Sequence, residues 1–203
     1  SGPTDLTKAS RLNANAGTAF QGPVKVGPFD VTDDKARKWL LGVVNPNGRP
    51  NLDVLRPWAN GMDISKRSSG KWIIDFGEMT EQDAALYEEP FEYVRRNVYP
   101  ARMNNRDDQR RRNWWRLGRS GSDLKNATAD LRRVIITPRV SKWRLFVWKP
   151  PMLLPDSAVV AIARDDDTTF GILHSRFHEL WALRMGTWLG KGNDPRYTPT
   201  TTF

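Results

Sequence analysis

The stretch Val134–Trp148, with the sequence VIITPRVSKWRLFVW, carries most of the information about the fold of this chain. Branched and aromatic residues are concentrated in it, as is typical of strands, and they predict two strands, Val134–Val140 and Trp143–Trp148. Because Pro138 has no backbone N–H to donate to a neighbour, we expect the first strand to lie at a sheet edge or to contain a bulge. The apolar run Ala158–Ala163 predicts a third, buried strand.

A long helix is predicted downstream of these strands. Phe170–Leu189 has apolar residues at helical spacing on one face, and Gly190 and Gly192 are suited to end the helix. The residues of that face are Leu173, Phe177, Leu180, Trp181 and Trp188. The acidic residues Asp165–Asp167 precede the helix, and we expect them to cap its N-terminus.

Further helices and one more strand are predicted upstream. Thr32 is a suitable N-cap for a helix over Asp33–Leu41, and Trp72–Phe76 reads as a strand. Thr80 and Asp83 begin a helical region that Pro90 is expected to kink or divide. Since strands and helices do not alternate strictly, we predict an α+β fold with a mixed sheet and several helices.

The domain organisation is predicted to be simple. Residues 1–18 read as a loose leader, and residues 19–203 as a single domain. The chain begins with Ser1 instead of Met and stops at a Thr-Thr-Thr-Phe sequence, so we expect it to be a fragment of a larger protein.

The net charge of +9 favours a polyanionic partner, because neutralised phosphates release counterions on binding. A membrane is the competing anionic surface, but no apolar run approaches the length of a spanning helix, so nucleic acid is preferred. The chain has no Cys, which excludes disulfides and thiolate metal sites and is compatible with a cytoplasmic location.

The segment 95–119 is the most basic part of the sequence. It contains Arg95, Arg96, Arg102, Arg106, Arg110, Arg111, Arg112, Arg116 and Arg119, and within it only Asp107 and Asp108 oppose them. We expect these arginines to hold DNA phosphates, with Arg106, Arg110, Arg111, Arg112 and Arg116 as the leading candidates. Trp114 and Trp115, which lie inside the run, are expected to pack in the core.

A second basic cluster accompanies the predicted strands. It comprises Arg132, Arg133, Arg139, Lys142 and Arg144. Arg139, Lys142 and Arg144 lie near a strand connection from which side chains could reach base edges, and His174 and Arg176 could do so from the start of the long helix. The alternative is an ordinary surface role for each of the basic residues and a polar helix face for His174.

No catalytic centre is visible in the sequence. His174 and His178 have a zinc-compatible spacing, but no third ligand is evident, and Asn45–Gly48 lacks the second proline and the aromatic residue of an adenine-methylating tetrapeptide. A phosphate-binding loop, a glycine-rich cofactor loop and a nucleophile elbow are also missing. We therefore predict no catalytic, cofactor-binding or metal-binding residues in this chain.

Several segments, in this order, resemble the target-recognition region of MmeI-like adenine methyltransferases, a family of single-chain restriction–modification enzymes and their relatives. They are Ala19–Phe29, Asp53–Trp58, Asn60–Ile64, Trp72–Gly77, Thr137–Lys142, Leu173–Arg176 and Arg196–Phe203. The resemblance implies that this region recognises double-stranded DNA. It also implies a covalently linked upstream domain that binds S-adenosylmethionine and methylates adenine N6, and it leaves a nuclease domain in the parent enzyme open.

Two other functions are compatible with the basic composition. A metal-dependent nuclease domain would cleave DNA by itself. A single-strand- or RNA-binding module would prefer unpaired substrates and would depend on Trp114 or Trp115 for base stacking.

Overall fold

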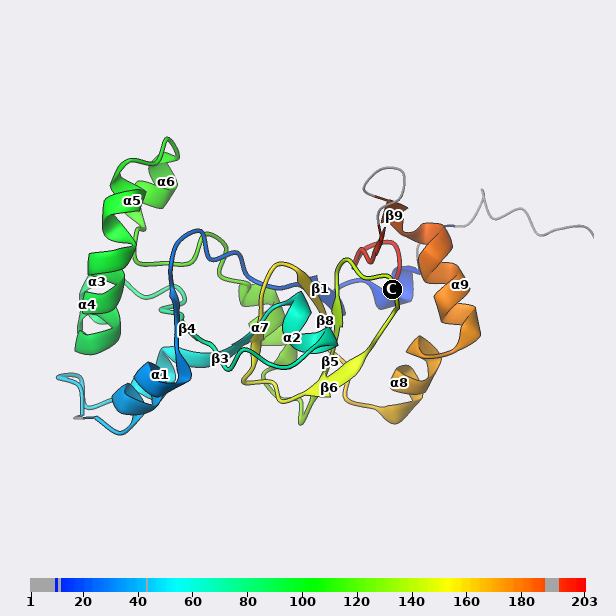
Figure 1. Cartoon of the computed structure of the whole chain (residues 1–203), viewed down its shortest axis with the longest axis horizontal. Helices are drawn as coiled ribbons and strands as arrows, with labels where there is room; N and C mark the ends of the chain where they lie inside the picture. The colour runs from blue at the N-terminus through cyan, green and yellow to red at the C-terminus, as the bar shows by residue number, and fades with distance from the viewer. Residues whose placement is uncertain (1–9, 11, 43, 189–193) are drawn as a thin grey trace, which may run out of the picture.

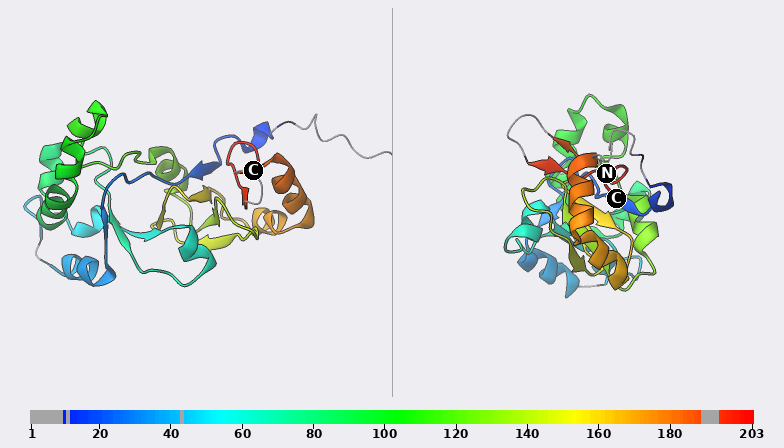
Figure 2. Two further views of the ribbon diagram at one scale, coloured as in Figure 1. Left: turned by 45° about the horizontal axis from the view of Figure 1, so that its top comes forward. Right: turned by 90° about the vertical axis from the view of Figure 1, so that its right-hand side faces the viewer.

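A computed structural model describes residues 10, 12–42, 44–188 and 194–203 of the chain. The molecule is elongated (Figures 1 and 2), with the helices of residues 81–112 at one end and those of residues 167–185 at the other. Two four-stranded sheets lie between these ends, and a two-stranded ribbon forms a third sheet. The fold is α+β, as predicted.

The first sheet has the order β1-β8-β5-β6, and all its neighbouring strands are antiparallel. Its strands are β1 (Ala19–Gln21), β8 (Val159–Ile162), β5 (Val134–Pro138) and β6 (Val147–Lys149). β5 is therefore a central strand, so the expectation of an edge or bulged strand was wrong. The sheet tolerates Pro138 because this proline is the last residue of β5, beyond the part that pairs with β6.

The second sheet has the order β2-β4-β3-β7, and its β3–β7 pair is parallel. Its strands are β2 (Asp30–Val31), β4 (Trp72–Ile74), β3 (Leu55–Ala59) and β7 (Leu154–Pro155). β4 confirms the strand predicted at Trp72. The ribbon pairs β9 (Thr187–Trp188) with β10 (Pro195–Arg196) in antiparallel orientation.

Two helices in the first half of the chain begin where the sequence predicted. Thr32 caps α1 (Asp33–Leu40), and Thr80 caps α3 (Glu81–Ala85). The helical region does divide, with α4 (Glu88–Asn97) as the second piece and Pro90 in its first turn, where a missing N–H costs little. A short 3-10 helix, η3 (Asn51–Asp53), and α2 (Gly61–Ser65) flank β3.

The basic segment after α4 is partly helical. Residues 102–122 contain the end of α5 (Tyr99–Met103), the whole of α6 (Asp108–Arg112) and the first residue of α7 (Ser122–Thr128). Trp114 and Trp115 pack in the core beneath this segment, as expected, and each is only 6% exposed.

The long helix predicted at Phe170–Leu189 is two helices, α8 (Asp167–Leu173) and α9 (Arg176–Met185). The Ser175 hydroxyl caps α9 by accepting from the His178 N–H, and this cap interrupts the helical pattern. Of the apolar residues placed on one face of that single helix, Leu173 is buried, but Phe177, Leu180 and Trp188 are exposed. Gly190 and Gly192 lie outside the described residues.

Three groups of apolar side chains form the core. One lies around the second sheet and α1, α3 and α4, one beneath α2 and α7, and one between the first sheet and α8–α9. The C-terminal Phe203 belongs to the third group, and Figure 1 shows the C-terminus between the first sheet and α9. The η2 turn (Asn13–Asn15) precedes β1, and residues 1–9 and 11 of the predicted leader lie outside the described residues.

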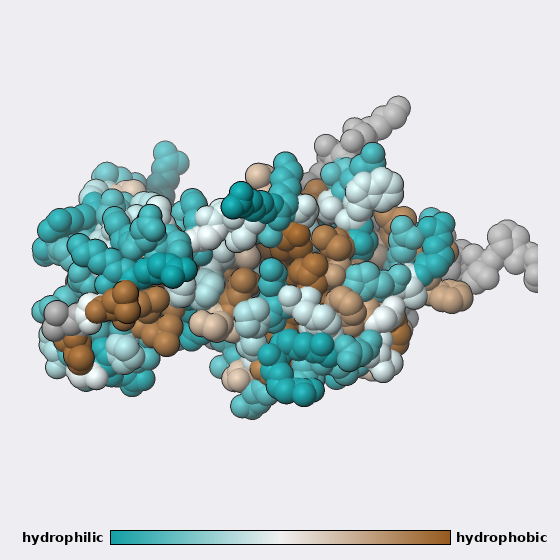
Figure 3. Space-filling view, turned by 60° about the horizontal axis from the view of Figure 1, so that its bottom comes forward, coloured by the Kyte–Doolittle hydropathy of each residue, from teal (hydrophilic) through white to brown (hydrophobic). Residues whose placement is uncertain are grey.

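The surface is mostly polar. Figure 3 shows one long side of the molecule, largely covered by hydrophilic residues, with apolar surface gathered near its middle and toward one end. In the described part of the chain, no helix is long and apolar enough to cross a membrane.

Candidate nucleic-acid interface

The arginine run of residues 95–119 is largely neutralised within the protein. Glu92 pairs with Arg95 and Arg96, Asp107 with Arg110, Asp108 with Arg111 and Arg112, and Glu78 with Arg116. Asp107 and Asp108 are the acidic residues inside the run, and two more carboxylates come from outside it, Glu92 from α4 and Glu78 from the turn after β4. The shallow pocket in this region is lined by Glu78 and Asp107 as well as by arginines.

Two arginines of the run hold the fold together. Arg102 is 2% exposed, and its guanidinium donates hydrogen bonds to the carbonyls of Lys25, Val26 and Arg116. Burial is the main cause that lowers the pKa of Arg102. Arg116 donates to the carbonyls of Glu78 and Met79, so its donors are also largely occupied. Among the leading phosphate candidates, Arg106 and Arg112 are the fully exposed ones.

A different set of arginines gathers at the middle of the molecule. Arg139 directly follows β5, Arg196 ends β10, and Arg119 lies between α6 and α7. Arg119 and Arg139 line one surface depression of about 410 Å³, and Arg139 and Arg196 line another of about 650 Å³. Arg139 lines both depressions, and we call the two together the central groove.

Backbone hydrogen bonds fix the positions of these three arginines. The Arg139 N–H donates to the Ala158 carbonyl at 2.8 Å, and the Arg139 carbonyl accepts from the Tyr197 N–H at 2.7 Å. Val140 and Arg196 form an antiparallel bridge, and Val24 and Arg119 form another. The Arg119 guanidinium also donates to the Gly22 carbonyl at 2.9 Å.

Small polar side chains line the rest of the central groove. Gln21, Ser120, Ser122, Thr198 and Thr200 line the first depression, and Asn60, Ser65 and Ser157 line the second. Two carboxylates are present as well. Asp123 lines the first depression and Asp156 the second, and burial raises the pKa of Asp156.

No carboxylate among the described residues lies within ion-pairing distance of Arg119, Arg139 or Arg196. The pKa of Arg139 is lowered, first by burial and then by the positive charges of Arg196 and Arg119. Arg139 therefore experiences the positive charge of both Arg196 and Arg119. The central groove combines hydrogen-bond donors with positive charge that the described part of the protein leaves uncompensated.

The other predicted base-contacting residues lie in different environments. Arg144 is half-buried, donates to the carbonyls of Pro138 and Pro195, and stacks on the Tyr197 ring at 5.0 Å. It supports the backbone on both sides of the central groove, and its donors are turned toward the protein. Lys142 is exposed on the loop between β5 and β6, with its amine 5.3 Å from the Trp143 ring.

The residues at the α8–α9 junction divide in the same way. Arg176 is exposed and pairs only with Glu179, one turn further along α9. His174 is exposed and its Nδ1 lies 3.0 Å from the Phe170 carbonyl oxygen. His178 is held against Tyr197, with 3.0 Å between the ring Nε2 and the phenol oxygen. Within the described residues, no group of three or more His, Asp or Glu side chains could hold a metal ion.

The acidic residues before α8 serve structural roles. Asp166 caps α8 by accepting from the Thr169 N–H at 2.7 Å, as expected for this acidic sequence. Asp165 and Asp167 pair with Arg132 and Arg133, which accounts for two members of the second basic cluster. Asn45 is buried and donates to the Arg49 carbonyl and to Asn51, so it stabilises its own loop.

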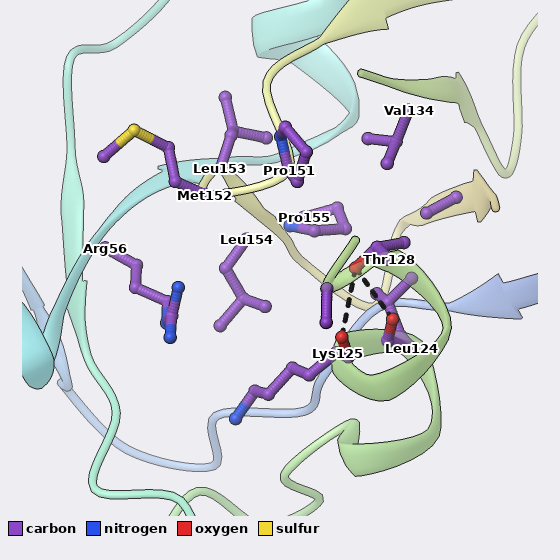
Figure 4. A pocket seen from close by; sticks show the side chains of 12 residues that line it. Arg56, Leu124, Lys125, Thr128, Val134, Pro151, Met152, Leu153, Leu154 and Pro155 are labelled. Carbon is purple, nitrogen blue, oxygen red and sulfur yellow. Dashed lines mark hydrogen bonds between the residues drawn. The ribbon is translucent and has the colours of Figure 1, made fainter. Parts of the chain in front are cut away.

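A separate cavity of about 380 Å³ lies where α7, β3 and β7 meet. Figure 4 shows that Met152, Leu153, Leu154 and Pro155 line it together with Arg56 and Lys125. The Lys125 amine is already paired with the buried carboxylate of Asp75. The cavity is mainly apolar and carries less uncompensated charge than the central groove.

Comparison with known proteins relates this chain to a solved structure by its fold. No family model and no curated protein matches the sequence. Among solved structures, the Type IIL restriction–modification enzyme MmeI in complex with DNA matches 91% of this chain, with a TM-score of 0.69 and 14% sequence identity. This chain shares its fold with part of MmeI. It spans about a quarter (24%) of the length of that MmeI chain.

Sequence reasoning missed part of the central groove. It singled out Arg139 but not Arg196, Asn60 or Gln21, and it assigned Arg119 to the neutralised run. Arg196 and Asn60 both lie in segments that carry the family resemblance, Arg196–Phe203 and Asn60–Ile64. The sequence does not indicate that Arg196 and Asn60 lie near Arg139, because only the folding of the sheet and the ribbon brings these distant segments together.

Proposed function

We propose that this chain recognises double-stranded DNA as the target-recognition region of a site-specific adenine-N6 DNA methyltransferase of the restriction–modification type. The observation that carries the proposal is the fold match to MmeI, a restriction–modification enzyme in complex with DNA, over 91% of this chain. The ordered sequence segments that resemble MmeI-like enzymes support the same assignment.

The charge distribution supports duplex DNA as the partner. A groove lined by arginines, serines, threonines and amides offers the donors that phosphates and base edges accept. Stacking of unpaired bases on Trp114 or Trp115, as a single-strand binder requires, is disfavoured because both rings are buried.

The proposal assigns different roles to the predicted contact residues. Lys142 and Arg176 are exposed, so they remain candidates for base contacts, and His174 is exposed beside Arg176. Arg106 is exposed and would make a phosphate contact at the periphery, whereas Arg110, Arg111 and Arg112 stay paired with Asp107 and Asp108 and are not assigned phosphate contacts. We exclude Arg116 and Arg144 from the contact set, since their donors are bonded to backbone carbonyls.

The methylation chemistry is assigned to a linked upstream domain that binds S-adenosylmethionine, while this chain supplies the specificity. In the proposed parent enzyme, a base-contacting residue contributes about 1–3 kcal/mol of discrimination against a wrong base. A phosphate-contacting residue contributes none, because every base pair carries the same phosphates.

The binding test compares three nucleic acids of matched length with the isolated chain: a duplex, a single DNA strand and a hairpin RNA. Fluorescence anisotropy is expected to show preferred binding to the duplex, with an affinity that falls steeply as salt increases. Preference for the single strand, or affinity independent of salt, would contradict the proposal. Calorimetry with S-adenosylmethionine is expected to show no stoichiometric binding to this chain.

The specificity test uses the full-length enzyme. Methylated adenines are mapped genome-wide in cells that express Lys142→Ala or Arg176→Ala. At least one variant is expected to relax or alter one position of the methylated motif while activity remains. If both retain the parental motif with reduced occupancy, other residues read the bases.

A further inference from the structure

Three arginines from distant parts of the sequence line the central groove, with Arg139 shared by its two depressions. Arg119 and Arg139 line its first depression, and Arg139 and Arg196 its second. Each backbone is fixed by hydrogen bonds to a neighbouring segment, so the cluster does not depend on a flexible loop adopting one conformation. Gly186 allows β10 to approach α9 closely, since a Cβ there would lie 2.7 Å from the Arg196 carbonyl oxygen.

The protein supplies no anion for this cluster within the described residues. Asp156 lines the second depression, but its carboxylate accepts from the Ala158 N–H and pairs with none of the three arginines. In the 95–119 run, by contrast, carboxylates contact every exposed arginine except Arg106 and Arg119. A cluster of like charges held together by the backbone is unfavourable until an anion neutralises it.

The positive charge of the cluster favours an anionic partner over a neutral one. One arginine can pair with guanine O6 and N7 through two hydrogen bonds, but a base edge carries no net charge to balance two further guanidinium groups. A phosphate diester carries a full negative charge and two unesterified oxygens that accept several donors at once. We propose that Arg119, Arg139 and Arg196 together bind a single backbone phosphate of duplex DNA.

This inference rests on the proposed function and deepens it, because it moves Arg139 from base reading to phosphate binding. The groove would fix the register of the duplex, while neighbouring exposed residues such as Lys142 would contact bases. Ser120 and Thr200 line the same depression as Arg119 and Arg139, and their hydroxyls add neutral donors for phosphate oxygens.

The pKa of Arg139 is consistent with this arrangement. Burial lowers it first, and the charges of Arg196 and Arg119 lower it further. A bound phosphate would reverse the second effect, since it places a negative charge among the three guanidinium groups.

The test measures how the affinity of the chain for random-sequence duplexes depends on salt. The groove variant is Arg119→Ala with Arg139→Ala and Arg196→Ala. Its matched control is Arg110→Ala with Arg111→Ala and Arg112→Ala, which removes the same charge from the neutralised run. A third variant replaces the three groove arginines by lysine and keeps the charge. Circular dichroism and thermal melting verify that each variant is folded.

The groove variant is expected to lose affinity at least about ten-fold for all duplexes alike, as the loss of charged hydrogen bonds implies. The slope of log affinity against log salt should shrink by about 0.9, the value for one phosphate. The control should lose less than about three-fold with an unchanged slope, and the lysine variant should retain most of the slope.

Three results would overturn the inference. An unchanged slope in the groove variant would show that these arginines do not bind phosphate, and a slope change about three times as large would show three separate phosphates. Loss of affinity for only some duplex sequences would assign Arg139 to base reading. In all three cases duplex binding by the unaltered chain would still support the proposed function, whose own failure is absence of duplex binding.

A last experiment distinguishes two possible ligands of the groove, a DNA backbone phosphate and free inorganic phosphate. Inorganic phosphate is titrated into the unaltered chain by calorimetry and is also added as a competitor of the duplex. Weak competition, removed in the groove variant, supports the inference. Tight binding of inorganic phosphate that leaves duplex affinity unchanged would show a site for the free ion and overturn it.

Discussion

The 95–119 arginine run and the central groove are both rich in arginine, but they differ in what surrounds the charge. In the run, carboxylates from α4, α6 and the turn after β4 contact most of the exposed guanidinium groups. Three arginines line the groove, and no described carboxylate pairs with them. The number of arginines in a sequence window is therefore a poor guide to where an anion binds, and the local balance of charge is a better one.

The largest effect is expected from a buried member of the run. Arg102→Ala leaves three carbonyl oxygens without their donor, so the free energy of unfolding should fall by about 3 kcal/mol. Urea denaturation followed by tryptophan fluorescence measures this loss. A loss as small as that of an exposed arginine would show that Arg102 does not organise this end of the molecule.

At the groove, the second test uses a substitution that disturbs the close packing of α9 against β10. In Gly186→Ala, the new Cβ would lie 2.6 Å from the Ala182 carbonyl oxygen and 2.7 Å from that of Arg196, so α9 and β10 must separate. We expect a loss of about 2 kcal/mol in the free energy of unfolding and weaker duplex binding. Gly171→Ala is the control, because nothing lies within 4 Å of a Cβ there. Equal behaviour of the two variants would contradict the tight packing behind Arg196.

Acidification should weaken the groove side of the molecule before the run. Burial, followed by the charges of Arg144 and His174, lowers the pKa of His178 from 6.5 to about 4. Between pH 6.5 and about 4, His178 is therefore protonated in the unfolded chain but neutral in the folded chain. The free energy of unfolding consequently decreases as the pH falls from about 6.5 toward 4. Urea midpoints at several pH values measure the loss, and His178→Gln should reduce the slope in this window. An unchanged slope in that variant would show that other groups cause the acid sensitivity.

The smallest effect is expected from an exposed, paired arginine. Arg112 is 79% exposed on its side chain and pairs with Asp108, which Arg111 also contacts. Arg112→Ala should change the free energy of unfolding by less than about 0.5 kcal/mol and duplex affinity by less than about two-fold. A ten-fold loss of duplex affinity would contradict this expectation and would show that the 95–119 run contacts DNA directly.

Local features of the fold could be predicted from the sequence. Thr32 and Thr80 cap helices as expected, and the strands near Trp72, Val134 and Ala158 form as predicted, since caps and β-branched runs act over a few residues. The α8–α9 break had a local signal too, because Ser175 is a good N-cap, but the apolar pattern across it outweighed that signal.

Properties that depend on tertiary neighbours could not be predicted. The position of Pro138 in a central strand depends on β6 ending its pairing at Ile136. The neutralisation of Arg116 depends on Glu78, which lies 38 residues away in the sequence. The β-bridge between Arg196 and Val140 positions Arg196 at the groove. Arg144 is excluded as a contact residue because it donates its hydrogen bonds to the carbonyls of Pro138 and Pro195.

Hydrogen–deuterium exchange with and without a saturating duplex compares the two regions most directly, because it reports which backbone segments become protected on binding. Duplex binding through the central groove predicts protection in peptides that cover 119–123, 138–142 and 195–200, with little change in 95–116. Protection confined to 95–116, with the groove peptides unchanged, would contradict the account.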